Sequence, residues 1–186
     1  MSALNLAHHF LIAMPNMVDP LFARSLIYLC DHGEHGAMGV IVNKPSGVLM
    51  AQLFEQLELP LPDTRLAAEP VLFGGPVQTE RGFVLHSPIG SWQSSLVVDD
   101  ELALTTSKDV LVAVSEANGP ERMLVSLGYS GWEKGQLEEE LAANAWLTVA
   151  ADPAVLFSLP ADARYDAAIA LLGFDPMLLS GDVGHA

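Results

Sequence analysis

The sequence is short of cysteine and of basic residues, and each shortage excludes a class of protein. Cys30 is the single cysteine among 186 residues, so the chain can form no internal disulfide and no cysteine-rich zinc site. Its 8 lysines and arginines face 23 acidic residues, which gives a formal net charge of −15. Because nucleic-acid binding draws its sequence-independent affinity from Lys and Arg at the phosphates, we expect no direct binding to nucleic acid.

Long apolar runs are also missing. The chain is 51% hydrophobic and can bury a large core. No apolar stretch, however, approaches the roughly 20 residues that a membrane-spanning helix needs. The first residues, MSALNLAHH, lack the basic region that opens a signal peptide. We therefore expect a cytoplasmic protein without a membrane partner, folded as a single domain over residues 1–186.

Short apolar segments separated by Gly, Pro, Asn and Asp predict many strands and fewer helices. The expected strands are 10–14, 25–30, 39–43, 71–73, 82–86, 95–98, 102–106, 123–128 and 146–149. The expected helices are 49–57, 107–117 with Ser107 as N-cap, 136–145, a short one from Asp152, and 162–172. Short turns join the early strands, and helices are mixed in later. This order favours an α+β fold: a single domain with a mixed, largely antiparallel sheet and flanking helices.

The segment 128–141, GYSGWEKGQLEEEL, holds the densest group of polar and aromatic residues. If the strand ends at Gly128, then Ser130 and Trp132 lie at its exit, a common place for ligands. The alternative, that Trp132 fills an edge of the core, stays open. The three glutamates at 138–140 point in different directions at about 100° per residue, so they do not form a catalytic cluster.

Ser130 does not fit a hydrolase nucleophile. The elbow pattern G-x-S-x-G has its second glycine two residues after the serine, whereas here Gly131 follows directly. The required late histidine could only be His185.

The segment DHGEH at 31–35 places two histidines near two carboxylates, which suggests a metal site. Because the segment reads as a turn rather than a helix, we favour a polar turn and expect no metal. Cys30 ends an apolar strand, so we expect a buried, inert thiol whose pKa Asp31 raises further. Asn43 either ties down a loop or faces a ligand, and we favour the loop; we interpret the GGP at 74–76 as a tight turn.

Seven segments, in chain order, carry a resemblance to a known family. They are 9–15 (HFLIAMP), 19–25 (DPLFARS), 36–45 (GAMGVIVNKP), 74–76 (GGP), 81–86 (RGFVLH), 105–110 (TTSKDV) and 128–138 (GYSGWEKGQLE). Together they span nearly the whole chain, which resembles the AlgH/YqgE family of small bacterial proteins. The resemblance implies an α+β fold with strongly coiled, mixed sheets. Members are often described as regulators of transcription, and the family name comes from alginate production, but no catalytic or binding residues carry over.

These observations favour a regulatory protein that binds a protein or a small-molecule ligand, acts on transcription only indirectly and uses no cofactor. No complete set of catalytic residues is present in the sequence. The candidate ligand-binding residues are polar or aromatic groups at predicted turns: Arg24, His32, Asn43, His86, Ser130 and Trp132. The alternative is a small-molecule enzyme that uses His32 or His86 as acid–base, since histidine ordinarily titrates near neutrality.

Overall fold

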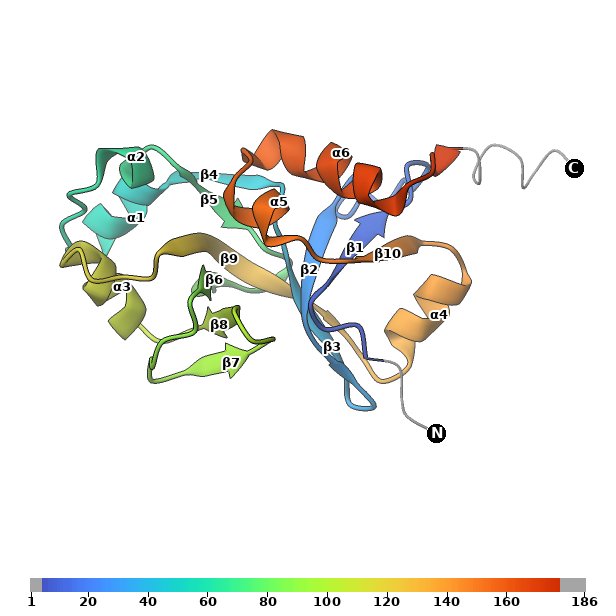
Figure 1. Ribbon diagram of the computed structural model, residues 1–186, viewed down its shortest axis with the longest axis horizontal. Coiled ribbons are helices and arrows are strands. Elements are labelled where there is room, and N and C mark those ends of the chain that lie inside the picture. Colours follow the sequence, from blue (N-terminus) through green and yellow to red (C-terminus); the bar gives the residue numbers. More distant parts are fainter. Residues whose placement is uncertain (1–4, 178–186) are drawn as a thin grey trace, which may run out of the picture. The chain divides into compact units, whose positions relative to one another are not determined.

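The computed structural model describes residues 5–177, which form two compact units (Figure 1). The first unit takes the chain up to residue 43 and again from residue 131, and the second unit takes residues 44–130. Each unit has its own set of strands and its own helices. That both units form one domain over residues 1–186 stays a prediction.

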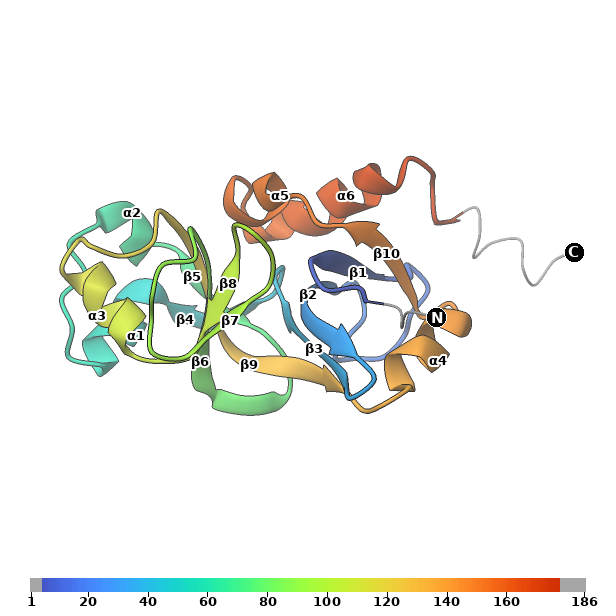
Figure 2. The ribbon, with the colours of Figure 1, turned by 60° about the horizontal axis from the view of Figure 1, so that its bottom comes forward.

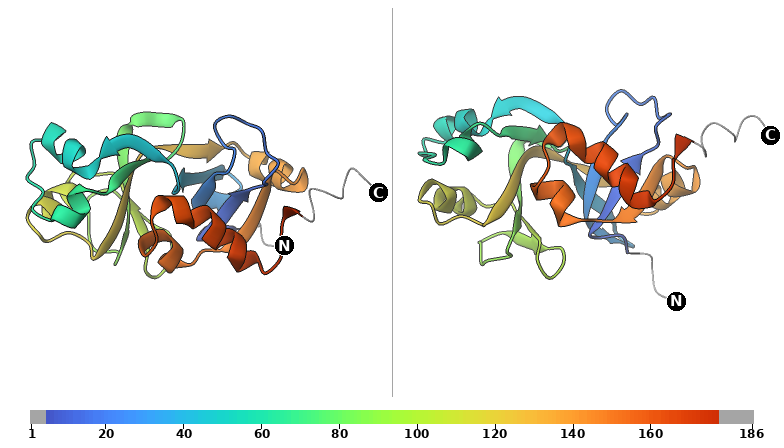
Figure 3. Two further views of the ribbon diagram at one scale, coloured as in Figure 1. Left: turned by 90° about the horizontal axis from the view of Figure 1, so that it is seen from above. Right: turned by 45° about the horizontal axis from the view of Figure 1, so that its top comes forward.

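The first unit contains an antiparallel sheet in the order β10-β1-β2-β3. Its strands are β1 (His9–Ala13), β2 (Leu26–Gly33), β3 (Gly36–Ile41) and β10 (Trp146–Ala150), and its helices are α4 (Gln136–Ala142), α5 (Pro153–Phe157) and α6 (Ala161–Leu172). Helix α6 lies against β1, β2 and β10 (Figure 3). The Tyr165 hydroxyl donates a hydrogen bond to the Ala13 carbonyl at 2.6 Å and anchors α6 on β1.

The second unit contains a mixed sheet in the order β4-β5-β9-β6-β8-β7. Its strands are β4 (Pro45–Leu49), β5 (Pro70–Phe73), β6 (Val77–Ser87), β7 (Ser95–Val97), β8 (Ala103–Thr105) and β9 (Arg122–Trp132), the last two residues of which belong to the first unit. Its helices are α1 (Met50–Gln56), α2 (Thr64–Ala67) and α3 (Asp109–Ser115). The β5–β9 pair is parallel and the other pairs are antiparallel.

Helices α1 and α3 pack on the sheet of the second unit because each carries an apolar face (Figure 2). Met50 and Phe54 of α1 meet Val110 and Val114 of α3 in one core, together with Val84 of β6. The α+β prediction, with a mixed and largely antiparallel sheet, is confirmed.

Several predicted boundaries were wrong. Strand β9 runs on to Trp132 instead of ending at Gly128, because the left-handed Gly128 (φ 77°) marks an irregularity inside the strand rather than its end. Helix α2 (Thr64–Ala67) is absent from the helices expected from the sequence. The N-cap of α3 is Lys108 rather than Ser107, whose hydroxyl donates to Asp109 instead.

The two glycines of the 74–76 segment serve a close approach of two backbones, not only a turn. A Cβ at Gly74 would lie 2.3 Å from the Gly128 carbonyl oxygen, and one at Gly75 would lie 2.2 Å from the Tyr129 carbonyl oxygen. Only glycine fits these positions without displacing the neighbouring strand.

Candidate functional site

His32 lies near the end of β2 and is buried between the N-terminal segment and α4. Its Nδ1 accepts a hydrogen bond from the Leu6 N–H at 3.0 Å, so the ring proton is on Nε2 when the ring is neutral. Nε2 lies 3.0 Å from Glu138 Oε2 on α4 and donates to it. The pKa of Glu138 is lowered, first by a hydrogen bond from its own backbone N–H and then by His32. His32 therefore ties two other segments of the unit to β2.

Trp132 is buried, and a glutamate one turn into α4 binds its indole. The indole N–H groups of Trp132 and Trp146 donate to the same oxygen, Glu140 Oε1, at 3.0 and 2.8 Å. The two rings pack edge to face with centroids 6.2 Å apart. Glu140 thus faces the tryptophans while Glu138 faces His32, which confirms that the glutamates do not converge. The contacts of Trp132 match the interpretation that it fills an edge of the core.

Asn43 and Arg24 meet at the other end of β2. Asn43 Oδ1 accepts from the Leu26 N–H and its Nδ2 donates to the Arg24 carbonyl, both at 2.9 Å. Asn43 therefore ties down this loop, as favoured from the sequence. The Arg24 guanidinium lies 4.6 Å from the centre of the Tyr165 ring and 3.7 Å from Asp166, and its side chain is 64% exposed.

The candidates of the first unit do not share one pocket. Arg24 precedes β2 and His32 lies near its end, so a rise of about 3.3 Å per residue separates them by roughly 25 Å. Whether either group binds a ligand stays a prediction.

The segment DHGEH does not bring its histidines together. His32 points inward, whereas the exposed His35 bonds Asp31 at 2.9 Å on the hairpin. Within residues 5–177, no group of three or more His, Cys, Asp or Glu side chains is placed to hold a metal ion. Cys30 is buried, and burial followed by the charge of Asp31 raises its pKa, so the expectation of a buried thiol with a raised pKa is confirmed.

His86, on β6 of the second unit, begins a chain of hydrogen bonds that ends at the surface. Its Nδ1 lies 2.9 Å from the Pro88 carbonyl oxygen, which can only accept, so Nδ1 carries the proton. Its Nε2 lies 2.6 Å from Thr105 Oγ1, which must therefore donate to it. Thr105 Oγ1 lies 2.6 Å from Ser95 Oγ and accepts the Ser95 proton.

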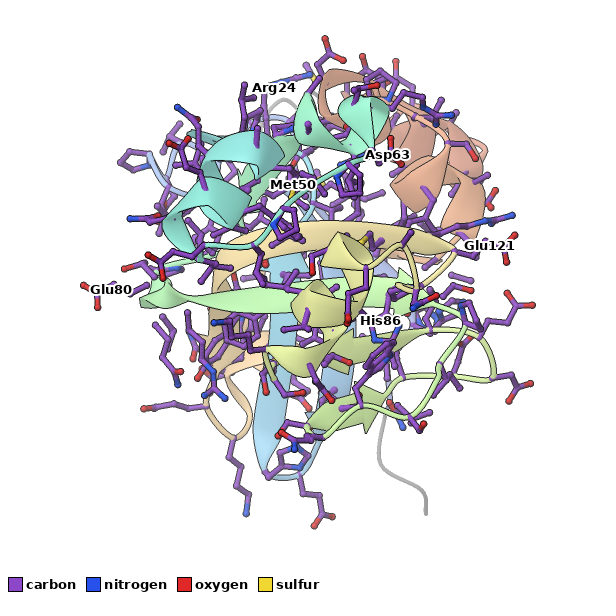
Figure 4. All side chains as sticks on the ribbon, turned by 90° about the vertical axis from the view of Figure 1, so that its left-hand side faces the viewer. Arg24, Met50, Asp63, Glu80, His86 and Glu121 are labelled. Atoms are coloured by element: carbon purple, nitrogen blue, oxygen red, sulfur yellow. The ribbon has the colours of Figure 1, made fainter. Side chains whose placement is uncertain are left out.

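The surroundings of His86 favour its neutral form. His86 and Thr105 are fully buried, and burial lowers the pKa of His86. Figure 4 shows His86 within the second unit, whereas the side chains of Glu80 and Glu121 project from its surface. The buried Nε1–H of Trp92, whose ring packs edge to face with His86, has no hydrogen-bond partner among the described residues.

Thr105 and Ser95 were not among the sequence candidates. Both lie in segments predicted as strands, but their meeting depends on the register Ser95↔Thr105 and Val84↔Thr105, which a sequence does not reveal. The alternation of side chains along each strand does not show that Thr105 and Ser95 share a face, because that depends on which residues pair.

Ser130 is buried and bonds across the close approach of the backbones at Gly74 and Gly128. Its hydroxyl donates to the Gly74 carbonyl at 3.1 Å. No histidine hydrogen bond to it is found among the described residues, and His185 lies outside them. A nucleophilic role gains no support from this geometry.

Comparison with known proteins places the chain in a family. The family model described as "DUF179: AlgH-like" matches residues 10–177, which include parts of both units. The chain belongs to the AlgH-like family. This AlgH-like chain is 68% identical to a UPF0301 protein of Chromobacterium violaceum and 60% identical to one of Laribacter hongkongensis, each over the full length of both chains.

Solved structures agree with the AlgH-like fold. The solution structure of the AlgH protein from Pseudomonas aeruginosa is 53% identical, with a TM-score of 0.79 over 100% of this chain and 98% of that one. A crystal structure of a Corynebacterium diphtheriae protein, 21% identical, covers 89% of this chain and 85% of its own with a TM-score of 0.68, and shows the fold alone. No helix in the described part of the AlgH-like chain is long and apolar enough to cross a membrane.

Proposed function

We propose that this AlgH-like protein acts by binding a basic segment of a partner protein in the cytoplasm, and that its effect on transcription is indirect. The observation that carries the proposal is the net charge of −15. A surface of one sign attracts and steers partners of the opposite sign and repels nucleic acid.

The use of the reactive side chains supports binding over catalysis. His32, Asn43, Ser130 and Trp132 each bond to a group of the protein itself. Cys30 is buried with a raised pKa. Groups held in this way stabilise the fold and are not presented to a substrate.

The experiment is a pair of titrations of the purified full chain. One uses a partner isolated by crosslinking in the source bacterium and then purified, and the other uses a labelled DNA duplex. We expect the partner to bind with an affinity that falls as salt screens the charges, and the duplex not to bind. A partner present at about 100 times its dissociation constant should also raise the unfolding free energy by about 2.7 kcal/mol. Tight, salt-sensitive binding to the duplex, or a partner whose affinity ignores salt, would sink the proposal.

A second candidate function is acyl transfer at Ser95, and the hydrogen-bond chain to His86 favours it. In this step Ser95 Oγ attacks the carbonyl carbon of an activated ester, and its proton passes to Thr105 while the Thr105 proton passes to His86 Nε2. The bond to the alcohol leaving group then breaks, the proton returns from His86 through Thr105 to the leaving group, and the acyl group stays on Ser95 as an ester. The test is the release of p-nitrophenol from its acetate by the wild-type chain and by Ser95→Ala, with Ser94→Ala as the matched control. Equal rates for all three chains would eliminate this candidate.

A further inference from the structure

Strand β7 ends the sheet of the second unit and has an open outer edge. It pairs with β8 on one side, and no strand among residues 5–177 pairs with it on the other. All three of its residues are exposed. In Figure 1 it lies beyond β8, which separates it from β6.

The hydrogen-bond pattern shows which backbone groups face outward. The Thr106 N–H donates to the Ser94 carbonyl and the Val98 N–H donates to the Leu102 carbonyl, both at 2.9 Å. In an antiparallel pair, alternate residues bond to the partner strand, so positions 94, 96 and 98 face β8. The N–H and C=O groups of Ser95 and Val97 therefore point away from the sheet, spaced to accept another strand.

The side chains at this edge do not protect it. Natural edge strands are blunted by proline, lysine or a bulge. At the other end of this sheet, β4 carries Pro45 and a left-handed Gly47 (φ 94°). In contrast, β7 presents Leu96 and Val97 at 38% and 55% exposure.

Carboxylates flank the edge at both ends. Asp99, Asp100 and Glu101 form the turn after β7, and Asp109 accepts from the Gln93 N–H just before it. Residues 91–109 contain these four acidic groups and one basic group, Lys108, which gives a net charge of −3. A second copy of this chain would bring the same negative charge to the edge, so the charge disfavours self-pairing.

We propose that the outer edge of β7 takes an extended segment of alternating basic and apolar residues from a partner protein as an additional β-strand. This binding site rests on the proposed function and locates the binding of the basic segment at β7. Backbone hydrogen bonds at Ser95 and Val97 supply affinity, and the flanking carboxylates select positive charge.

The test uses a fluorescent, end-blocked hexapeptide of alternating lysine and valine as the probe. A second peptide of the same sequence is N-methylated at alternate residues, so it keeps its charge but loses one edge of hydrogen bonds. On the protein, Val97→Pro removes an outward N–H and keeps the bonds of Leu96 and Val98 to β8, and Val97→Thr is the matched control. Amide spectra of both variants verify the fold.

We expect N-methylation and Val97→Pro each to weaken binding about tenfold, and Val97→Thr to change it less than about threefold. The double variant Asp100→Asn, Glu101→Gln should weaken binding about three- to tenfold at low salt and much less at high salt. Equal affinity of both peptides for the wild-type chain would overturn the edge site and leave the proposed function standing, since the charge alone would then bind. Failure of both peptides to bind at low salt would overturn both proposals. A dimer that Val97→Pro abolishes would identify a second copy as the occupant and overturn the basic partner.

Discussion

The two buried histidines, His32 of the first unit and His86 of the second, lie near the ends of strands but bond in opposite ways. His32 accepts at Nδ1 and donates from Nε2 to a carboxylate, Glu138. His86 donates from Nδ1 to a carbonyl and accepts at Nε2 from a hydroxyl, Thr105. One histidine is paired with a negative charge and the other is kept neutral by burial.

The difference lies in how much of each partner reaches solvent. The Glu138 side chain is 43% exposed, so this partner of His32 can exchange it for water. Thr105 is fully buried, and His86 is enclosed by β8 and the ring of Trp92. Similar positions in a sequence thus produce a tether in one unit and a buried polar network in the other.

Replacement of each histidine by alanine should lower the unfolding free energy most at His86. We expect His86→Ala to lower the unfolding free energy by about 3 kcal/mol, because it opens a cavity and removes two bonds in the core. His32→Ala should cost about 1.5 kcal/mol, since water can replace the imidazole at the exposed carboxylate of Glu138. Urea unfolding of the three chains at pH 7 measures both values. A larger loss for His32→Ala would reverse the comparison.

The strands could be predicted from the sequence more readily than the contacts of these histidines. Apolar segments bounded by Gly and Pro predicted most strands, because apolar composition indicates burial. Asn43 was correctly interpreted as a loop clamp, since it lies between a strand and a proline. The hydroxyl pair Thr105 and Ser95 could not be found, because it depends on strand register set by tertiary packing. For the same reason, the predicted strand ended too early, at Gly128. The irregularity in register that lets β9 continue lies in its pairing with β6.

The next largest effect is a pH dependence of the unfolding free energy, to which His86 contributes. Its pKa in the folded chain lies below the ordinary histidine value of 6.5, so the unfolded chain binds more protons in this window. Stability therefore falls as the pH drops below about 6.5, with a slope of at most about 1.4 kcal/mol per pH unit for one group. Urea unfolding at pH 7 and pH 5.5 should show a smaller loss in His86→Gln than in the wild-type chain. An equal loss would contradict the buried, neutral state of His86.

A smaller effect is expected at the carboxylate of the first unit. We expect Glu138→Gln to cost about 0.5–1 kcal/mol at pH 7, because a weaker, uncharged acceptor replaces the carboxylate beside His32. The folded pKa of Glu138 is lowered, so this stabilisation is present above the ordinary value of 4.5 and is lost as the pH falls through the folded pKa. Glu139→Gln, at the exposed neighbouring position, is the matched control and should change stability little. If both variants lose the same stability, the contact with His32 contributes nothing.

The last prediction involves no loss of stability and tests the comparison at its origin, the ring proton. At pH 7.5, long-range ¹⁵N–¹H spectra should show a protonated Nε2 and a bare Nδ1 for His32, because the Leu6 N–H occupies Nδ1. The spectra of His86 should show the reverse, because the Pro88 carbonyl can bond only to a protonated Nδ1. Thr105→Val is the control: it removes the donor to Nε2 and should shift that nitrogen while Nδ1 stays protonated. The same tautomer at both histidines would mean that one of the two networks is wired differently, and a bare Nδ1 at His86 would also break the proton path from Ser95.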